Sequence, residues 1–146
     1  IGFHKRGSFE GFCSGPGLAQ MMVSELHRFA EERGMVKRYK SPEKVTGKDV
    51  VEWAKTGDQL ALQVVDKSGT YLGEGLSILI DILNPEVIVV GSMGVRLGEL
   101  LFAPARKVIE KEAIPAAARV CRIVPAALGE KIGDFAALCV AMQEEK

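Results

Sequence analysis

The sequence predicts an α/β fold that is rich in helices and has few strands. A long segment with an apolar stripe, at about residues 57–83, stops at Asn84-Pro85. Four β-branched residues, Val87 to Val90, follow it, and then a turn with glycines at Gly91 and Gly94. This order is typical of a helix, a sharp stop, a buried strand, a glycine turn and a further helix. A second short strand is predicted at about residues 119–124.

Apolar residues recur at three- and four-residue spacings along most of the chain, which predicts amphipathic helices. The predicted helices lie at about residues 16–33, 47–55, 57–83, 97–112 and 131–142. Ser14 or Gly15 can cap the first helix, and Thr46 can cap the second. Thr56-Gly57-Asp58-Gln59 has the spacing of a capping box, so we expect Thr56 to open the longest helix.

Two of these helices carry residues that are predicted to face the core. In the last quarter of the longest helix, Ile78, Ile80 and Ile82 join the apolar stripe, so this part should be covered on most sides. In the last helix, Cys139 falls on the predicted core face. Glycines at positions 69, 73 and 75 interrupt the longest helix. They indicate the close approach of a ligand or of another backbone, and helix packing is the interpretation that we favour.

The predicted sheet is incomplete. If the two strands are parallel neighbours, they form a βαβ unit with a right-handed crossover. Two strands do not make a self-sufficient sheet, and the helices need a larger flat surface to cover. The missing strands must come from unrecognised segments or from outside the chain. We therefore expect residues 1–146 to be part of a larger protein.

Composition excludes several classes of protein. The 146 residues fit one domain, and the 19 basic and 19 acidic residues give no net field that would attract nucleic acid or an anionic membrane. Residues 35–42 are locally basic, but we favour a solvated linker there over a nucleic-acid contact. No apolar run approaches the roughly 20 residues of a membrane span, and no signal peptide is recognisable. Three widely spaced cysteines argue against a disulfide framework and favour a cytoplasmic location.

Few residues form a recognisable chemical site. The turn at the carboxyl end of the predicted strand is the place where open α/β sheets bind ligands. Its residues are Gly91, Ser92, Met93 and Gly94. The turn matches neither the dinucleotide fingerprint nor a Walker loop. Taken alone, its glycines are more often structural, and the alternative is that they allow a flat ligand such as adenine to approach. Glu10, which lies among glycines and aromatic residues, could accept hydrogen bonds from sugar hydroxyls or be an ordinary loop acid. His4 and His27 lack catalytic partners, and no cysteine has the spacing of a metal ligand.

Three stretches together resemble the C-terminal half of ROK proteins, the family of bacterial sugar kinases and sugar-responsive repressors. Each stretch is weakly specific alone, but their order and spacing match the family. The stretches are Ser8 to Gly15, Leu83 to Gly91, and Leu128-Gly129-Glu130 with Gly133 and Ala136-Ala137.

The resemblance implies part of an actin-like, ribonuclease-H-like ATPase fold, in which two lobes close on ATP and a hexose. Glu10 matches the acid of the family that binds sugar hydroxyls. Gly91 to Gly94 matches the turn beside the adenosine of ATP, so ATP and Mg²⁺ are the implied cofactors of the full-length protein. The resemblance also implies a homo-oligomer.

Some family features are missing from these residues. The cysteines that commonly bind zinc ahead of the sugar-binding acid correspond here to Ile1, Phe3 and Ser8, so zinc is not expected. The N-terminal phosphate loop (Asp-x-Gly-Gly-Thr) and the aspartate that acts as the catalytic base have no counterpart. We therefore expect no catalytic residue in this chain, and no phosphorylation by the chain alone.

Three functions remain open at this point. The first is the C-terminal part of an ATP-dependent hexose kinase, and the second is the sensor part of a sugar-responsive transcriptional repressor. The third is an inactive oligomerisation or scaffold domain. Upstream sequence would separate the first two, since one requires a phosphate loop and the other a DNA-binding helix.

Overall fold

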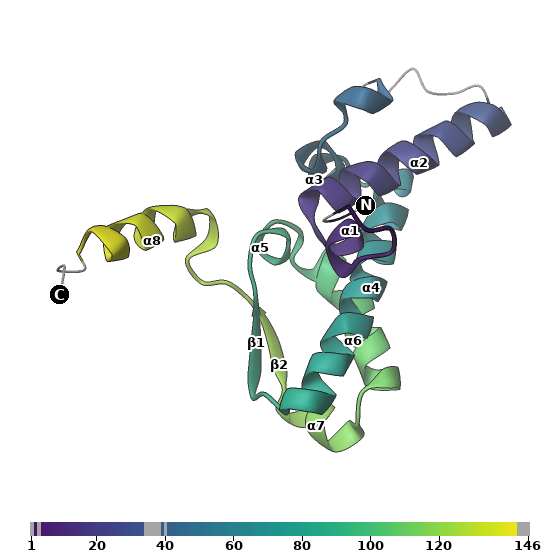
Figure 1. The fold of residues 1–146 in the computed structure, drawn as a ribbon. Helices are drawn as coiled ribbons and strands as arrows, with labels where there is room; N and C mark the ends of the chain where they lie inside the picture. The colour runs from purple at the N-terminus through teal and green to yellow at the C-terminus, as the bar shows by residue number, and fades with distance from the viewer. Residues whose placement is uncertain (1, 3, 34–38, 40, 143–146) are drawn as a thin grey trace.

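The computed structural model describes residues 2, 4–33, 39 and 41–142 (Figure 1). Helices dominate, and two short strands form one sheet. The elements, in chain order, are α1 (Phe9–Cys13), α2 (Gly15–Arg33), the 3-10 turn η1 (Pro42–Lys44), α3 (Gly47–Lys55), α4 (Gln59–Leu83), β1 (Val87–Val90), α5 (Met93–Leu97), α6 (Glu99–Glu112), α7 (Pro115–Val120), β2 (Arg122–Pro125), the 3-10 turn η2 (Gly129–Lys131) and α8 (Ile132–Ala141).

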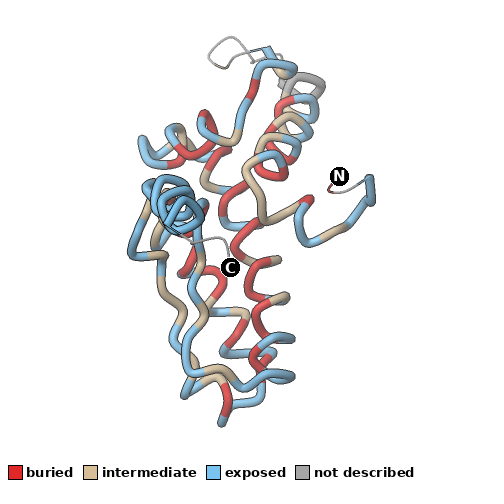
Figure 2. Tube along the Cα trace, turned by 60° about the vertical axis from the view of Figure 1, so that its left-hand side comes forward, coloured by how far each residue is buried: buried red, intermediate tan, exposed pale blue. Residues whose placement is uncertain are grey.

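The long helix α4 is the element against which most others pack. It contacts α6 along much of its length, and α1, α2 and α3 pack around its N-terminal half (Figure 1). A buried stripe follows its axis (Figure 2), and Ala61, Val64 and Val65 in this stripe are almost fully buried. The hydrophobic core therefore lies between helices rather than beneath the sheet.

The helix boundaries follow from side-chain capping. Thr46 caps α3, as predicted, and together with Asp49 it forms a reciprocal capping box. The Ser14 hydroxyl accepts a hydrogen bond from the Gly17 amide at 3.0 Å, which confirms Ser14 as a cap of α2.

The predicted capping box at Thr56 is wrong. The carboxylate of Asp58 accepts from the amide of Ala61 at 3.0 Å and opens α4 at Gln59. The Thr56 hydroxyl instead donates to the Trp53 carbonyl at the end of α3. Gly57, with φ +85°, separates the two helices, so Thr56 belongs to the first and not to the second.

The glycines of α4 are explained by close packing, as the favoured interpretation predicted. A Cβ atom on Gly69 would lie 2.4 Å from the Pro104 ring, and one on Gly73 would lie 2.5 Å from the Ala105 carbonyl oxygen. Both contacts are to α6. Gly75 instead faces the ring of Phe9 on α1.

The strands β1 and β2 pair in parallel, which confirms the predicted βαβ arrangement. The register runs from Val87 opposite Arg122 to Val90 opposite Pro125. Two details differ from the prediction. Residues 119 and 120 belong to α7, which Pro115 opens at its first turn, so β2 begins later than expected. The short helix α5 precedes α6, and Gly98 with φ +52° separates them.

Several residues predicted to be buried are exposed. In β1, Val89 is 59% exposed, and at the end of α4 Ile78 and Ile82 are 60% and 73% exposed. Ile80 alone of the three predicted isoleucines is fully buried. The described residues add no further strand beside β1 and β2, so this surface lacks the sheet that the apolar pattern anticipates.

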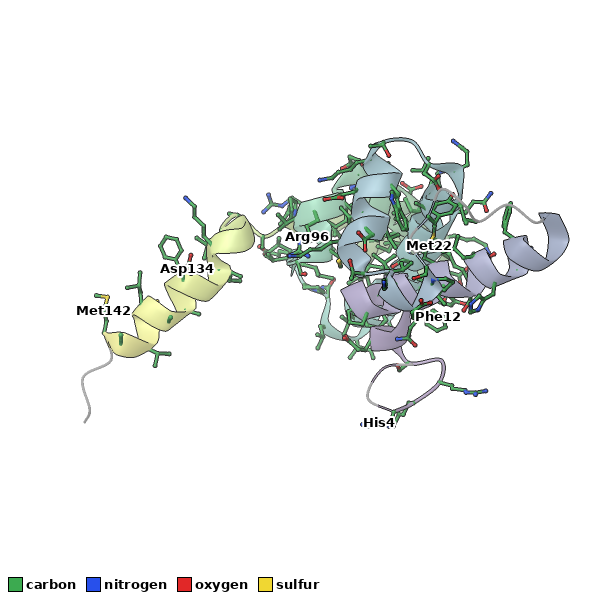
Figure 3. All side chains as sticks on the ribbon, turned by 90° about the horizontal axis from the view of Figure 1, so that it is seen from above. His4, Phe12, Met22, Arg96, Asp134 and Met142 are labelled. Atoms are coloured by element: carbon green, nitrogen blue, oxygen red, sulfur yellow. The ribbon has the colours of Figure 1, made fainter. Side chains whose placement is uncertain are left out.

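The last helix, α8, also departs from the prediction. Its residues are all exposed, including Cys139, which was expected to face the core. Figure 1 shows α8 extending away from the other helices. Viewed from above, Asp134 and Met142 lie far from the packed body that contains Met22 (Figure 3). The described residues provide no surface for its apolar side chains.

Gly34, which follows the first predicted helix, and most of the basic linker lie outside the described residues. None of the described helices is long and apolar enough to cross a membrane.

Candidate functional site

A cavity of about 410 Å³ connects the two sites predicted from the sequence. Glu10, Cys13 and Ser14 line one side, and Gly91, Ser92 and Met93 line the other. Leu72 of α4 and Leu101 of α6 complete its apolar wall. Its volume lies within the range of about 300–1,000 Å³ that is typical of small-molecule sites. Residues separated by about eighty positions in the sequence therefore line one half-open cavity.

Glu10 reaches this cavity because a short helix, α1, replaces the predicted loop. The Ser8 hydroxyl accepts hydrogen bonds from the amides of Gly2 and Gly11, both at 3.1 Å, and caps α1. At the other end, the Ser14 hydroxyl donates to the Glu10 carbonyl oxygen at 2.7 Å. Ser14 also caps α2, so one side chain holds the Glu10 backbone and the start of the next helix together.

The turn after β1 has an unusual backbone. Ser92 has φ +41° and ψ −95°, a conformation that is strained for a residue with a side chain. The turn is closed by a hydrogen bond from the Gly94 amide to the Gly91 carbonyl at 2.9 Å. No atom lies within 4 Å of a Cβ placed on Gly91, which leaves open space beside the backbone.

Gly94 has a different role from Gly91. A Cβ atom at this position would lie 2.8 Å from a methyl group of Val90 and 3.0 Å from the Phe102 ring. Gly94 is buried, and its absent side chain is explained by internal packing rather than by a ligand.

The electrostatic character of the cavity is acidic. Glu10 is the one charged residue among those that line it, and neither lysine nor arginine is present there. Burial, together with the nearby carboxylates of Glu10 and Glu74, raises the pKa of the Cys13 thiol to about 12. The cavity therefore suits a neutral ligand with hydroxyl groups better than an anionic one.

No metal site is evident in the part of the chain that the structure describes. Within these residues, no three histidine, cysteine, aspartate or glutamate side chains are grouped to hold a metal ion. Cys13, Cys121 and Cys139 are free cysteines.

The sequence did not predict several residues that line the cavity, among them Cys13, Leu72 and Leu101. The cysteine spacing suggested neither a disulfide nor a metal site, but Cys13 lies three positions after Glu10 on α1. Had residues 9–13 been recognised as helical, this spacing would have placed both residues on one face. Leu72 and Leu101 belong to apolar stripes that also form the core, so the sequence could not distinguish a cavity wall from packing.

The comparisons with known proteins agree with the resemblance seen in the sequence. Residues 4–144 match the ROK family. The chain is 30% identical over 141 residues to a glucokinase of Halalkalibacterium halodurans. This match covers 97% of this chain but only 42% of the glucokinase. The chain is 24% identical over 105 residues to a xylose repressor of Caldicellulosiruptor bescii, covering 72% of this chain and 26% of the repressor.

Comparison with a solved structure also points to the ROK family. The fold superimposes with a TM-score of 0.76 on a ROK family glucokinase from Streptomyces griseus, crystallised with glucose and AMPPNP. The sequences are 25% identical, and the match covers 93% of this chain and 45% of the glucokinase. The chain thus spans less than half the length of these relatives. With a family match along almost its whole length, the chain belongs to the ROK family.

Proposed function

We propose that this chain is the C-terminal part of an ATP-dependent hexose kinase with an actin-like ATPase fold. In this role it binds the sugar through Glu10 and flanks the nucleoside through the turn at Gly91, Ser92, Met93 and Gly94. The supporting observation is that Glu10 lines the same cavity as Gly91, Ser92 and Met93 of this turn. The glucokinases among its relatives support the choice of a hexose, and the free cysteines fit a cytoplasmic protein.

The chemistry of the cavity fits a neutral sugar. A carboxylate offers two acceptor oxygens to adjacent hydroxyl groups, and charge-assisted hydrogen bonds are stronger than neutral ones. The Ser14 hydroxyl, which lies at the same end of the cavity, is held by Glu10 and Gly17. Leu72 and Leu101 add apolar surface to the lining of the cavity.

This chain can contact only the nucleoside end of the nucleotide. Gly91 leaves space for a flat base, and Val90 and Met93 provide apolar surface beside it. The lining has no cation for the phosphate groups, and its single carboxylate would repel them. The described residues also lack a cluster that could hold Mg²⁺, so we assign neither phosphates nor magnesium to this chain.

The composition of the cavity defines which part of the kinase reaction this chain could support. When bound, ATP supplies the phosphoryl group for transfer to a sugar hydroxyl. The residues of this chain would hold the sugar, exclude water and flank the nucleoside, while the general base and the phosphate loop would come from an upstream half. We expect no kinase activity from residues 1–146 alone.

The second candidate function is the sensor part of a sugar-responsive repressor, which the similarity to the xylose repressor supports. Sequencing the coding region upstream of residue 1 separates the two functions. An Asp-x-Gly-Gly-Thr loop with an Asn-Asp pair supports the kinase, a helix-turn-helix supports the repressor, and the absence of both contradicts both.

Sugar binding by the chain itself can be tested by calorimetric titration with glucose. We expect measurable binding that weakens about tenfold or more in Glu10→Gln, because the neutral amide loses one acceptor and the charge. Glu52→Gln, an exposed position on α3, is the matched control and should bind as the original chain does. Equal affinity in all three proteins would remove Glu10 from the sugar site.

A further inference from the structure

The helix that carries Glu10 is too short to fix its own direction. Helix α1 has five residues, whereas isolated helices shorter than about 12 residues are marginal in water. The orientation of the Glu10 carboxylate must therefore come from contacts between α1 and its neighbours.

Helix α4 provides a strong anchor at the end of α1. The Ser68 hydroxyl donates to the Phe12 carbonyl oxygen at 2.8 Å, and the Cys13 thiol donates to the Ser68 carbonyl oxygen at 3.8 Å. Ser68 is 1% exposed, so both interactions are shielded from water. The ring of Phe12 stacks on that of Tyr71 with centroids 4.0 Å apart and an angle of 22° between the rings.

The contacts lie on one face of α4. Ser68, Tyr71 and Gly75 follow each other at spacings of three and four residues, which places them on one side of a helix. Gly75 accommodates the ring of Phe9, because a Cβ there would lie 2.3 Å from a ring carbon. Glu10 lies between these anchored positions in sequence and is one of the residues that line the cavity.

We propose that Ser68 and Tyr71 are positioning residues, which act through α1 to direct the Glu10 carboxylate into the cavity. This inference rests on the proposed sugar-binding function of Glu10. Neither residue lines the cavity itself, so their effect on a ligand is indirect. The buried hydroxyl of Ser68 is the central element of this arrangement, since it holds the backbone two residues beyond Glu10.

A second buried serine on the same helix provides a matched control. The Ser77 hydroxyl donates to the Gly73 carbonyl at 2.8 Å within α4 itself, and Ser77 is 4% exposed. Ser68→Ala and Ser77→Ala thus remove the same group from similarly buried positions of one helix. The first breaks a contact with α1, whereas the second does not.

Two measurements test the proposal in the full 146-residue chain, at a temperature where all variants are folded. The first is the dissociation constant for glucose by calorimetry. The second is the alkylation rate of Cys13, measured in a background with Cys121→Ser and Cys139→Ser. Because the Cys13 thiol bonds to Ser68, this rate reports the docking of α1 without any ligand.

We expect Ser68→Ala to weaken glucose binding about three- to tenfold, as one lost hydrogen bond allows, and to accelerate Cys13 alkylation. Tyr71→Ala should act in the same direction, and Ser77→Ala should leave both quantities unchanged. Unchanged glucose affinity in Ser68→Ala, with or without faster alkylation, would overturn the positioning role and leave the proposed function intact. Equal losses in Ser68→Ala and Ser77→Ala would also overturn it. If the unsubstituted chain does not bind glucose, the proposed function fails, and this inference fails with it.

Discussion

Gly73 of α4 lies directly against the backbone of Ala105 in α6. A Cβ on Gly73 would stand 2.5 Å from the Ala105 carbonyl oxygen and 2.7 Å from the Val108 Cβ. Neither neighbour is the mobile end of a side chain, so an added methyl group would force the two helices apart.

Gly73→Ala should therefore destabilise the chain, although alanine favours helices by up to about 1 kcal/mol relative to glycine. Overpacking costs about 1–3 kcal/mol, so we expect a net loss in the free energy of unfolding of up to about 2 kcal/mol. Urea denaturation measures this loss. Gly133→Ala in α8, where no atom lies within 4 Å of an added Cβ, is the control and should not destabilise.

The start of α4 is tested by two neighbouring substitutions. Asp58→Ala removes the N-cap and should lower the free energy of unfolding by about 0.5–2 kcal/mol. Tyr39 donates its hydroxyl to the same carboxylate at 2.8 Å, which places the expected effect in the upper part of this range. Thr56→Ala should cost less, because its exposed hydroxyl bonds only to Trp53. If Thr56→Ala lowered the free energy of unfolding more than Asp58→Ala does, this result would contradict capping by Asp58 and support the capping box that the sequence predicted at Thr56.

The environment of Cys13 predicts that its thiol is alkylated slowly. Its pKa of about 12 lies three units above the ordinary value of 9.0, so the thiolate fraction near pH 7 falls about a thousandfold. Greater nucleophilicity at higher pKa recovers about 16- to 32-fold of this loss, which leaves alkylation about 30- to 60-fold slower than for an unperturbed thiol. Mass spectrometry after timed alkylation should show Cys139, which is exposed, modified well before Cys13. Faster modification of Cys13 would contradict its described surroundings.

Two isoleucines near the end of α4 allow the contribution of burial to stability to be tested. Ile80 is fully buried, whereas Ile82 is 73% exposed on the same helix. Ile80→Ala should lower the free energy of unfolding by about 2–5 kcal/mol, and Ile82→Ala should change it by less than about 0.5 kcal/mol. Similar losses at both positions would show that an apolar surface covers Ile82 in solution.

Local patterns in the sequence predicted much of the fold. The bounds of α3 and β1 follow from Thr46 and from the run Val87 to Val90, because capping and β-branching act over a few residues. The errors at Ile82 and Cys139 have another origin. Their apolar patterns anticipate a covering surface, and the described residues do not contain it.

The candidate site was predictable in part. Glu10 and the turn at Gly91 were identified separately, but their convergence on one cavity depends on the docking of α1 against α4. The anchors of this docking, Ser68 and Tyr71, lie in a helix that the sequence explained by core packing alone. Contacts between segments far apart in the chain leave no local signal.

The central claim is that the cavity between Glu10 and the turn after β1 binds a hexose. Amide chemical shifts of the isotope-labelled chain, recorded during a glucose titration, test it most directly. We predict saturable shifts at Glu10 and Ser14, which lie on the sugar side of the cavity, and none at Gly133 in α8. An absence of shifts at the cavity, or shifts confined to other parts of the chain, would contradict the claim.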